Sequence, residues 1–266
     1  MKDIEIIIER SDSAVQRIID VQKTGRKSPK TFLIEDEEPI LQALGAGIDF
    51  LEIYGRQGVP IRPEILALSK ERDVRVRLLS TELVNQVFRV EKKPKVFALA
   101  RIPKQAKLSD LADVTGDLVI LDGVQIVGNI GAIVRSAYAL GAGAVVLLRS
   151  GLETVSERRL VRASRGYVFS LPVIISQDQA LVDYLKVTGT KAVSLDIGGE
   201  LKIDDLGVLN ERLALIFGSE KTGASKETWA GQVSAVQIPM RPGAESLNVS
   251  VAAGITLQAR QAFNLS

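Results

Sequence analysis

Residues 118–148 read Leu-Val-Ile-Leu-Asp-Gly-Val-Gln-Ile-Val-Gly-Asn-Ile-Gly-Ala-Ile-Val-Arg-Ser-Ala-Tyr-Ala-Leu-Gly-Ala-Gly-Ala-Val-Val-Leu-Leu. The stretch begins with the strand-like run Leu118 to Asp122, which is apolar up to its final Asp, and ends with another apolar run, Ala144 to Leu148. Such runs are typical of parallel strands that are buried on both faces. The residues between them, 128–140, have a helical pattern. A strand, a helix and a second strand in this order predict an α/β fold.

The same alternation extends to the C-terminus and predicts a parallel sheet with helices on both sides. Further strands are expected at residues 173–175, 192–195, 213–217 and 235–238, and helices at 178–187, 225–230 and 246–263. Ser246 is placed to cap the last of these helices, with Asn248 in its first turn.

A second, smaller α/β unit precedes this one. Its strands are expected at residues 31–34, 50–54, 74–78 and 96–100, and its helices at 13–21, 39–46, 63–72 and 81–88, with Ser11 or Ser13 capping the first helix and Ser80 the last. The polar, basic segment that follows contains Pro103 and reads as a connector. We therefore predict a domain over residues 1–105, a linker over 106–116 and a second domain over 117–266.

The composition removes several classes of chemistry. The chain has no Cys and no His, which excludes thiolate nucleophiles and any Ser-His-Asp triad and removes the commonest metal ligand. No metal is expected. The N-terminus does not read as a signal peptide, and no apolar run is long enough for a membrane helix. These features predict a cytoplasmic protein that does not associate with membranes.

The net charge of +2 conceals local basic clusters. Clusters of this kind attract phosphate backbones, although each one alone is equally compatible with a solvated surface. Together they favour RNA or DNA as a partner. They comprise Lys23, Arg26, Lys27 and Lys30; then Arg89, Lys92, Lys93, Lys95, Arg101, Lys104 and Lys107; and finally Arg149, Arg158, Arg159, Arg162 and Arg165.

Three segments at strand ends or helix starts carry polar groups beside small residues. The first is Asn129-Ile-Gly-Ala-Ile-Val-Arg135, where a helix N-terminus offers free N–H groups. An N-cap Asn and a surface Arg would explain it equally well. The second, Gly218-Ser-Glu-Lys-Thr-Gly223, lacks the Lys-Ser/Thr that a P-loop requires after its last glycine. The third joins Ile238-Pro-Met240 to Ser246-Leu-Asn-Val-Ser250. Since ligands bind at the carboxyl ends of parallel strands, these segments are the candidate site.

In this order the three segments resemble the signature motifs of the SpoU branch of the SPOUT methyltransferases. Three further segments resemble the thiostrepton/nosiheptide-resistance rRNA methyltransferases within that family. They are Ala14-Val-Gln-Arg-Ile-Ile-Asp20, Val84-Asn-Gln-Val-Phe88 and Arg162-Ala-Ser-Arg-Gly-Tyr-Val-Phe-Ser-Leu-Pro172. The similarity spans nearly the whole chain.

The resemblance implies a C-terminal trefoil-knot domain that forms a homodimer and an N-terminal RNA-binding domain similar to ribosomal protein L30e. It implies S-adenosylmethionine as cofactor and methylation of a ribose 2′-hydroxyl. For the resistance enzymes the substrate is one adenosine in the 23S rRNA hairpin of the GTPase-associated centre, and its methylation blocks thiopeptide antibiotics.

The resemblance also assigns residues. The cofactor is expected on Leu195, Gly218, Ser219, Glu220, Ile238, Pro239, Met240, Ser246, Leu247 and Asn248. Core packing is the alternative reading for Leu195, Ile238 and Leu247.

The reaction is expected to use Arg135, Asn129, Glu220, Asn248 and Arg165. The family makes Arg135 the proton acceptor, yet guanidinium is a poor base, so a phosphate clamp is the second possibility. Arg165 would bind substrate phosphate or the methionine carboxylate, or would be an ordinary surface residue. The RNA hairpin is expected on Lys23, Arg26, Lys27, Lys30, Lys92 and Lys93.

Other readings of the chain follow from the same features. A dinucleotide-dependent oxidoreductase is disfavoured because the glycine-rich fingerprint is missing. A non-catalytic RNA-binding protein would share the basic clusters but has no need of all three motifs. Among methyltransferases, tRNA and other rRNA sites are alternative substrates.

Overall fold

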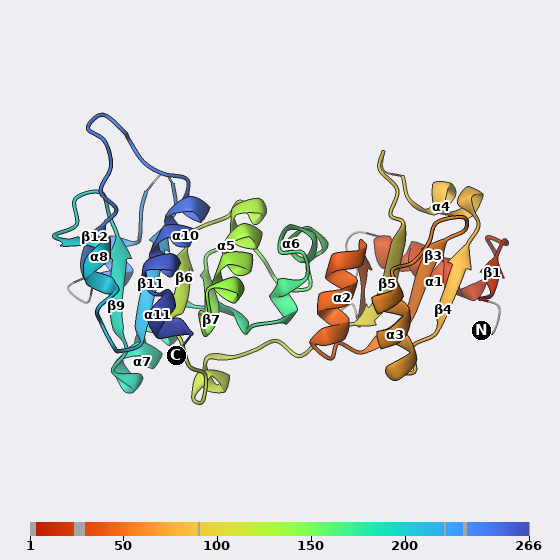
Figure 1. The fold of residues 1–266 in the computed structure, drawn as a ribbon, viewed down its shortest axis with the longest axis horizontal. Coiled ribbons are helices and arrows are strands. Elements are labelled where there is room, and N and C mark those ends of the chain that lie inside the picture. Colours follow the sequence, from red (N-terminus) through yellow and green to blue (C-terminus); the bar gives the residue numbers. More distant parts are fainter. Residues whose placement is uncertain (1–3, 24–29, 90, 221, 231–232, 266) are drawn as a thin grey trace. The chain divides into compact units, whose positions relative to one another are not determined.

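The computed structural model describes residues 4–23, 30–89, 91–220, 222–230 and 233–265. The chain forms two compact units, residues 1–104 and 105–266 (Figure 1). Within the described residues no helix has both the length and the apolar character needed to cross a membrane.

The second unit is built on a seven-stranded sheet in the order β10-β12-β9-β11-β6-β7-β8. Every neighbouring pair in it is parallel. The prediction of an α/β fold with a parallel sheet is therefore confirmed. The strands are β6 (Leu118–Asp122), β7 (Ala144–Leu148), β8 (Val173–Ser176), β9 (Lys191–Leu195), β10 (Leu201–Lys202), β11 (Leu213–Gly218) and β12 (Val233–Gln237).

Helices cover both faces of this sheet. On one face, alternate residues of β6, Leu118 and Ile120, join a core with Leu181 and Leu185 of α7 (Asp178–Thr188) and with Leu111 of the short η1 (Leu108–Leu111). Leu111 thus places part of the connector in the second core. Val119 and Leu121 alternate to the other face and are fully buried as well.

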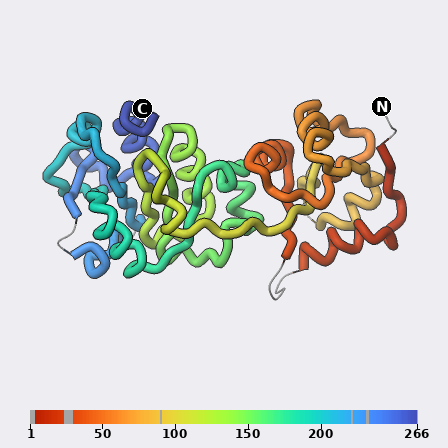
Figure 2. Tube along the Cα trace, turned by 90° about the horizontal axis from the view of Figure 1, so that it is seen from below, coloured from red at the N-terminus to blue at the C-terminus, as the bar shows by residue number. Residues whose placement is uncertain are grey.

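That other face is covered by α5 (Val127–Ala139) and α10 (Val249–Ala259), which contact β7 and β11 respectively. The two helices also lie side by side, the blue C-terminal segment next to the green α5 (Figure 2). The remaining helices are short. They are α6 (Arg158–Ala163), η2 (Tyr167–Phe169), α8 (Ile203–Leu206), α9 (Lys226–Trp229) and α11 (Gln261–Asn264). The threading that a trefoil knot requires stays a prediction.

A buried ion pair anchors the C-terminal helices at the amino edge of the sheet. Both Asp117 and Arg260 are fully buried, and the guanidinium donates to the two carboxylate oxygens over 2.8 and 3.0 Å. Arg260 also donates to the backbone carbonyls of Leu206, Leu209 and Glu211. A buried pair with all its partners present holds its geometry firmly, and losing one partner would be strongly destabilising.

The first unit has a mixed sheet of five strands in the order β1-β4-β3-β5-β2, in which β5 is antiparallel to β2 and β3. Its strands are β1 (Ile6–Ile7), β2 (Thr31–Glu35), β3 (Phe50–Arg56), β4 (Val76–Leu79) and β5 (Val96–Arg101), and its helices are α1 (Ser13–Gln22), α2 (Glu37–Gly45), α3 (Pro63–Glu71) and α4 (Thr81–Val87).

A polar group is buried in this first unit as well. The Glu52 carboxylate accepts hydrogen bonds from Arg77 and, over 2.6 Å, from the hydroxyl of Tyr54. Burial, and then the hydrogen bond to Glu52, raise the pKa of Tyr54 well above its usual value. The hydroxyl therefore keeps its proton and stays a donor.

The helix starts correct three predictions made from the sequence. Asp12, not Ser11 or Ser13, caps α1 by accepting from the backbone of Ala14. Asn129 lies inside the first turn of α5, so it is not an N-cap. The last long helix begins at Val249 with Asn248 as its cap, which leaves Ser246 outside the helix. The cap at Ser80 is confirmed.

Candidate active site

A pocket lies at the carboxyl edge of the second sheet, where β12, β9 and β11 end beside one another. Its volume is about 330 Å³. That lies at the small end of the range for ligand pockets. The lining residues are Leu195, Asp196, Ile197, Phe217, Gly218, Ser219, Glu220, Gly223, Val236, Ile238, Met240, Ser246, Leu247, Val249 and Ala252.

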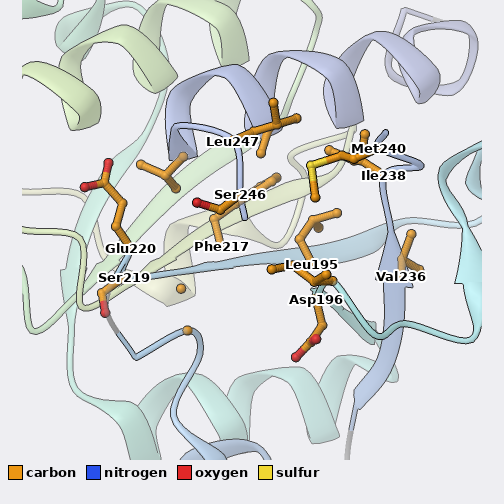
Figure 3. A pocket seen from close by; sticks show the side chains of 15 residues that line it. Leu195, Asp196, Phe217, Ser219, Glu220, Val236, Ile238, Met240, Ser246 and Leu247 are labelled. Carbon is orange, nitrogen blue, oxygen red and sulfur yellow. The ribbon is translucent and has the colours of Figure 1, made fainter. Parts of the chain in front are cut away.

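All of the residues predicted to hold a cofactor line this pocket, except Pro239 and Asn248. Figure 3 shows the side chains of Leu195, Met240 and Leu247 gathered on one side, with the Glu220 carboxylate away from them on the other. Leu195, Ile238 and Leu247 are all half-buried. They therefore form an apolar wall of the pocket and are not sealed core residues.

Several lining residues were missed from the sequence. Asp196 and Ile197 directly follow the predicted Leu195, and Phe217 directly precedes Gly218. Their adjacency to predicted residues at strand ends was a usable signal. Ala252 gave none, because it enters the pocket from the end of the first turn of α10.

The loop after β11 is closed on itself by close backbone packing. Ser219 N donates to Gly223 O over 3.2 Å, and Gly223 N donates to Ser219 O over 2.9 Å. A Cβ at Gly218 would stand 2.0 Å from Ala224 N. Only glycine fits there, which explains why the sequence has one at the start of the loop.

The three polar segments meet at Glu220. Asn129 Nδ2 donates to Glu220 Oε1 over 2.9 Å, and Asn248 Nδ2 donates to the same oxygen over 3.3 Å. Asn248 Nδ2 also lies 3.3 Å from Asn129 Oδ1. The cap holds Asn248 in place, since its Oδ1 accepts from Ser250 N. Two amides thus fix one carboxylate at the edge of the pocket.

Gly131 allows the end of α6 to pack closely against α5. A Cβ at Gly131 would stand 2.5 Å from Ala163 Cβ and 2.7 Å from Ser164 N. The end of α6 therefore packs directly on the α5 backbone, and the next residue, Arg165, takes a left-handed conformation with φ of 52°. An exposed, basic turn follows from this packing.

The structure does not link the two predicted arginines to the Glu220 cluster. Arg135 and Arg165 are both exposed. Within the described part of the chain, neither guanidinium is hydrogen-bonded to Asn129, Glu220 or Asn248. Both cations are directed to solvent, where a phosphate could reach them.

The residues predicted to bind RNA lie partly outside the described ranges, since Arg26 and Lys27 fall there. Lys30 and Lys92 are exposed, and Lys93 is half-buried. Lys23 forms an exposed ion pair with Asp20 over 2.6 Å. A surface pair of this kind is weak and leaves the ammonium available to a phosphate.

Two family models match the chain in tandem. Residues 4–114 match the N terminus of the thiostrepton-resistance methylase, and residues 117–258 match the SpoU rRNA methylase family. The chain belongs to the SpoU rRNA methylase family. This membership confirms the resemblance seen in the sequence.

Relatives within the SpoU family match along the full length. The chain is 51% identical over 266 residues to the 23S rRNA (adenosine(1067)-2′-O)-methyltransferase of Streptomyces laurentii, covering 100% of this chain and 98% of that protein. It is 46% identical over 266 residues to the enzyme of the same name from Streptomyces azureus, covering 100% and 99%. The crystal structure of the SpoU methyltransferase AviRb from Streptomyces viridochromogenes with AdoMet shares the fold, with a TM-score of 0.78, 22% identity and coverage of 96% of this chain and 99% of that chain.

The pocket suits the cofactor that a SpoU methylase requires. Leu195, Ile238 and Leu247 offer apolar contact for a flat adenine, and the pocket also exposes the carboxylates of Asp196 and Glu220. Carboxylates suit a ligand with ribose hydroxyls and positive charge. The residues present therefore fit S-adenosylmethionine.

Proposed function

We propose that this protein transfers a methyl group from S-adenosylmethionine to the ribose 2′-hydroxyl of one adenosine in 23S rRNA. The target is the hairpin of the GTPase-associated centre, and the methylation confers resistance to thiopeptide antibiotics. The observation that carries the proposal is the meeting of Asn129, Glu220 and Asn248 at the edge of the apolar pocket. The names of the two Streptomyces relatives support the choice of substrate.

In this proposal the pocket residues hold the cofactor, with Pro239 supporting the turn between Ile238 and Met240. Bound S-adenosylmethionine supplies an electrophilic methyl group on a positively charged sulfur. Glu220, fixed by Asn129 and Asn248, orients the ribose at the pocket edge. Holding the two reactants in line can supply a large share of the rate enhancement.

Arg135 and Arg165 act on the RNA from the α5 and α6 segments. A guanidinium stays protonated in proteins, which favours Arg135 as a clamp on the substrate phosphate that also eases loss of the hydroxyl proton. On transfer the 2′-oxygen gains the methyl group, its proton passes to solvent water, and S-adenosylhomocysteine is the other product. The family alternative, Arg135 as proton acceptor, requires the guanidinium to lose a proton. Arg165 binds a second phosphate or the methionine carboxylate.

The protein functions as a homodimer in this proposal. Helix α10 carries no charged residue, yet Val251 is 49% exposed and Ile255 is 37% exposed one turn later. A helix without charges that exposes large apolar side chains one turn apart normally has a neighbour on that face. Val251 and Ile255 form the exposed stripe of α10, and a second copy packed on this face would bury it. The first unit binds the RNA in this proposal through Lys23, Arg26, Lys27, Lys30, Lys92 and Lys93. The proposal also places the protein in the cytoplasm.

Methyl transfer to defined RNAs tests the proposal. The protein is incubated with methyl-tritiated S-adenosylmethionine and either a naked 23S rRNA fragment that contains the hairpin or a total tRNA pool. We expect label in the 23S fragment alone. Label in no RNA would overturn the enzyme proposal, and label in tRNA would overturn the choice of substrate.

A further inference from the structure

A buried carboxylate next to the pocket belongs to none of the three motifs. Asp122 is the last residue of β6, at the same sheet edge as the pocket, and is only 2% exposed. Burying a carboxylate is costly unless it is paired and hydrogen-bonded. The hydrogen-bond and ion-pair partners of Asp122 therefore indicate its structural role.

One oxygen of Asp122 binds the segment that follows the Glu220 loop. Oδ2 accepts from Ser225 N over 2.8 Å and from the indole Nε1 of Trp229 over 2.8 Å. These two donors are the cap residue and the last residue of α9 (Lys226–Trp229). Asp122 thus holds both ends of that short helix.

The other oxygen of Asp122 pairs with Arg149, which follows β7 and has a left-handed φ of 49°. The Arg149 guanidinium also pairs with Asp178 at the start of α7. Asp178 in turn accepts from Thr228 Oγ1 over 3.0 Å. The linked ion pairs of Asp122, Arg149 and Asp178 therefore connect α9 to β6, β7 and α7.

This attachment lies immediately after the loop that carries Glu220. The loop leaves β11 at Gly218, closes through the Ser219 and Gly223 backbone pair, and reaches Ser225 two residues later. One end is held by the sheet and the other by Asp122. The position of the loop therefore depends on β11 and on Asp122. Ser219 and Glu220, which line the pocket, move with the loop.

We infer that Asp122 is a positioning residue: through α9 and with Arg149 it holds the Glu220 loop in the conformation that binds the cofactor. The inference rests on the proposed function, because it assumes that S-adenosylmethionine occupies this pocket. Replacing Asp122 by Asn leaves one acceptor oxygen and adds two N–H donors beside Ser225 N, Trp229 Nε1 and Arg149. The amide oxygen can still accept from Ser225 N and Trp229 Nε1, but the NH2 group then faces the Arg149 guanidinium, so the Asp122–Arg149 pair that ties α9 to β7 and α7 is lost.

The same strand supplies a matched control. Asp117 directly precedes β6 at the opposite sheet edge, is fully buried, and likewise binds an arginine and a backbone N–H. Asp117→Asn removes a comparable charge from a comparable site, but Asp117 has no contact with α9 or the pocket. A purely structural effect would appear in both variants.

The test measures binding of S-adenosylhomocysteine by calorimetry for wild type, Asp122→Asn and Asp117→Asn, together with the melting temperature and the amide exchange of residues 218–220 and 222–225. Since a hydrogen bond to a charged group contributes roughly tenfold or more to an equilibrium, we expect at least about tenfold weaker binding in Asp122→Asn. Its loop amides should exchange faster. The emission of Trp229, the single tryptophan, should also shift.

Asp117→Asn should bind within about twofold of wild type even where its melting temperature falls, because the sites are far apart in the sheet. Equal affinity of Asp122→Asn and wild type would overturn the inference, as would equal losses in both variants. If Asp122→Asn does not fold, Arg149→Lys replaces it, since Arg149 is partly exposed and a lysine cannot bridge two carboxylates as a planar fork. A wild-type protein that binds no S-adenosylhomocysteine would instead contradict the proposed function.

Discussion

At the scale of single residues, the site depends on one carboxylate oxygen. Glu220 Oε1 accepts from both Asn129 and Asn248, which come from segments far apart in the chain. Each amide supplies a donor where a carboxylate would repel. The chemical identity of Asn129 therefore matters beyond its size.

Asn129→Asp tests this arrangement with an isosteric change. The new carboxylate would face Glu220 over the 2.9 Å now spanned by a hydrogen bond, and like charges at that distance repel. We expect methyl transfer to fall by about tenfold or more, consistent with loss of a charge-assisted hydrogen bond. The assay is the initial rate on the 23S fragment.

Gln125→Glu is the control for Asn129→Asp. It adds the same charge just before α5, at an exposed side chain with no contact to Glu220. Its rate should stay near that of wild type. An equal loss in both variants would mean that local negative charge, not the Glu220 contact, is responsible.

Arg135→Lys tests the role of the exposed guanidinium on α5. Lysine keeps the charge but loses the planar fork that binds phosphate through two parallel hydrogen bonds. We expect methyl transfer to fall roughly 100-fold, as when one transition-state donor is removed. Cofactor affinity should not change, because Arg135 does not line the pocket. A near-normal rate would contradict a role that needs the guanidinium fork.

At the scale of elements, the contact between α5 and α6 depends on a missing side chain. Gly131→Ala places a methyl group 2.5 Å from Ala163 Cβ, and overpacking of this kind costs about 1–3 kcal/mol. We expect a melting temperature several degrees lower, since about 1 kcal/mol shifts a protein of this size by roughly 2–4 °C.

Gly128→Ala is the matched control in the same helix. A Cβ at Gly128 meets no atom within 4 Å, so alanine should gain about 0.5–1 kcal/mol from its better helix propensity. Calorimetric unfolding should therefore show opposite shifts for the two variants. A stabilised Gly131→Ala would show that α5 and α6 do not pack this closely in solution.

The sequence predicted long elements well and local geometry less well. The apolar run of β6 marks a strand buried on both faces, and no other reading of it is reasonable. Helix α6 has only six residues, too few for a periodic pattern to emerge. The cap at Asn248 was misplaced by two residues because Ser246 is an equally good cap by type.

In the candidate site, too, some residues could be predicted from the sequence and others could not. Leu195, Ile238 and Leu247 were assigned through the resemblance to the SpoU family, and they line the pocket. The Asp122 contacts could not be predicted, because Ser225 and Trp229 lie more than 100 residues away. A carboxylate at a strand end gives no signal of which distant donors it will meet.

At the scale of the whole molecule, the homodimer and the RNA grip are the proposals with the widest consequences. Val251→Glu places a charge in the exposed stripe of α10, and burying it in an interface would be costly. We expect the dimer to dissociate, as measured by sedimentation equilibrium. Val187→Glu is the control, because Val187 on α7 is 87% exposed and isolated from α10. A dimer that persists with Val251→Glu would place the interface elsewhere.

Arg26→Ala tests the assignment of RNA binding to the first unit. Loss of one phosphate contact should weaken binding at all RNA sequences and lower the salt slope of the binding constant by about one. Affinity for S-adenosylhomocysteine should be unaffected, since the pocket is formed by the second unit alone. Filter binding over a range of salt concentrations gives the slope. Loss of cofactor affinity would contradict the assignment.

The proposed product is a 23S rRNA in which one adenosine carries a methyl group on its ribose 2′-oxygen. A 2′-O-methyl group blocks alkaline cleavage at the next phosphodiester. Mass spectrometry of alkali-treated rRNA, after incubation with the protein and S-adenosylmethionine, therefore identifies both the modified atom and the nucleotide. We predict one alkali-resistant dinucleotide that begins with methylated adenosine and maps to the GTPase-associated-centre hairpin. A methylated base, a resistant dinucleotide from another site, or complete hydrolysis would contradict it.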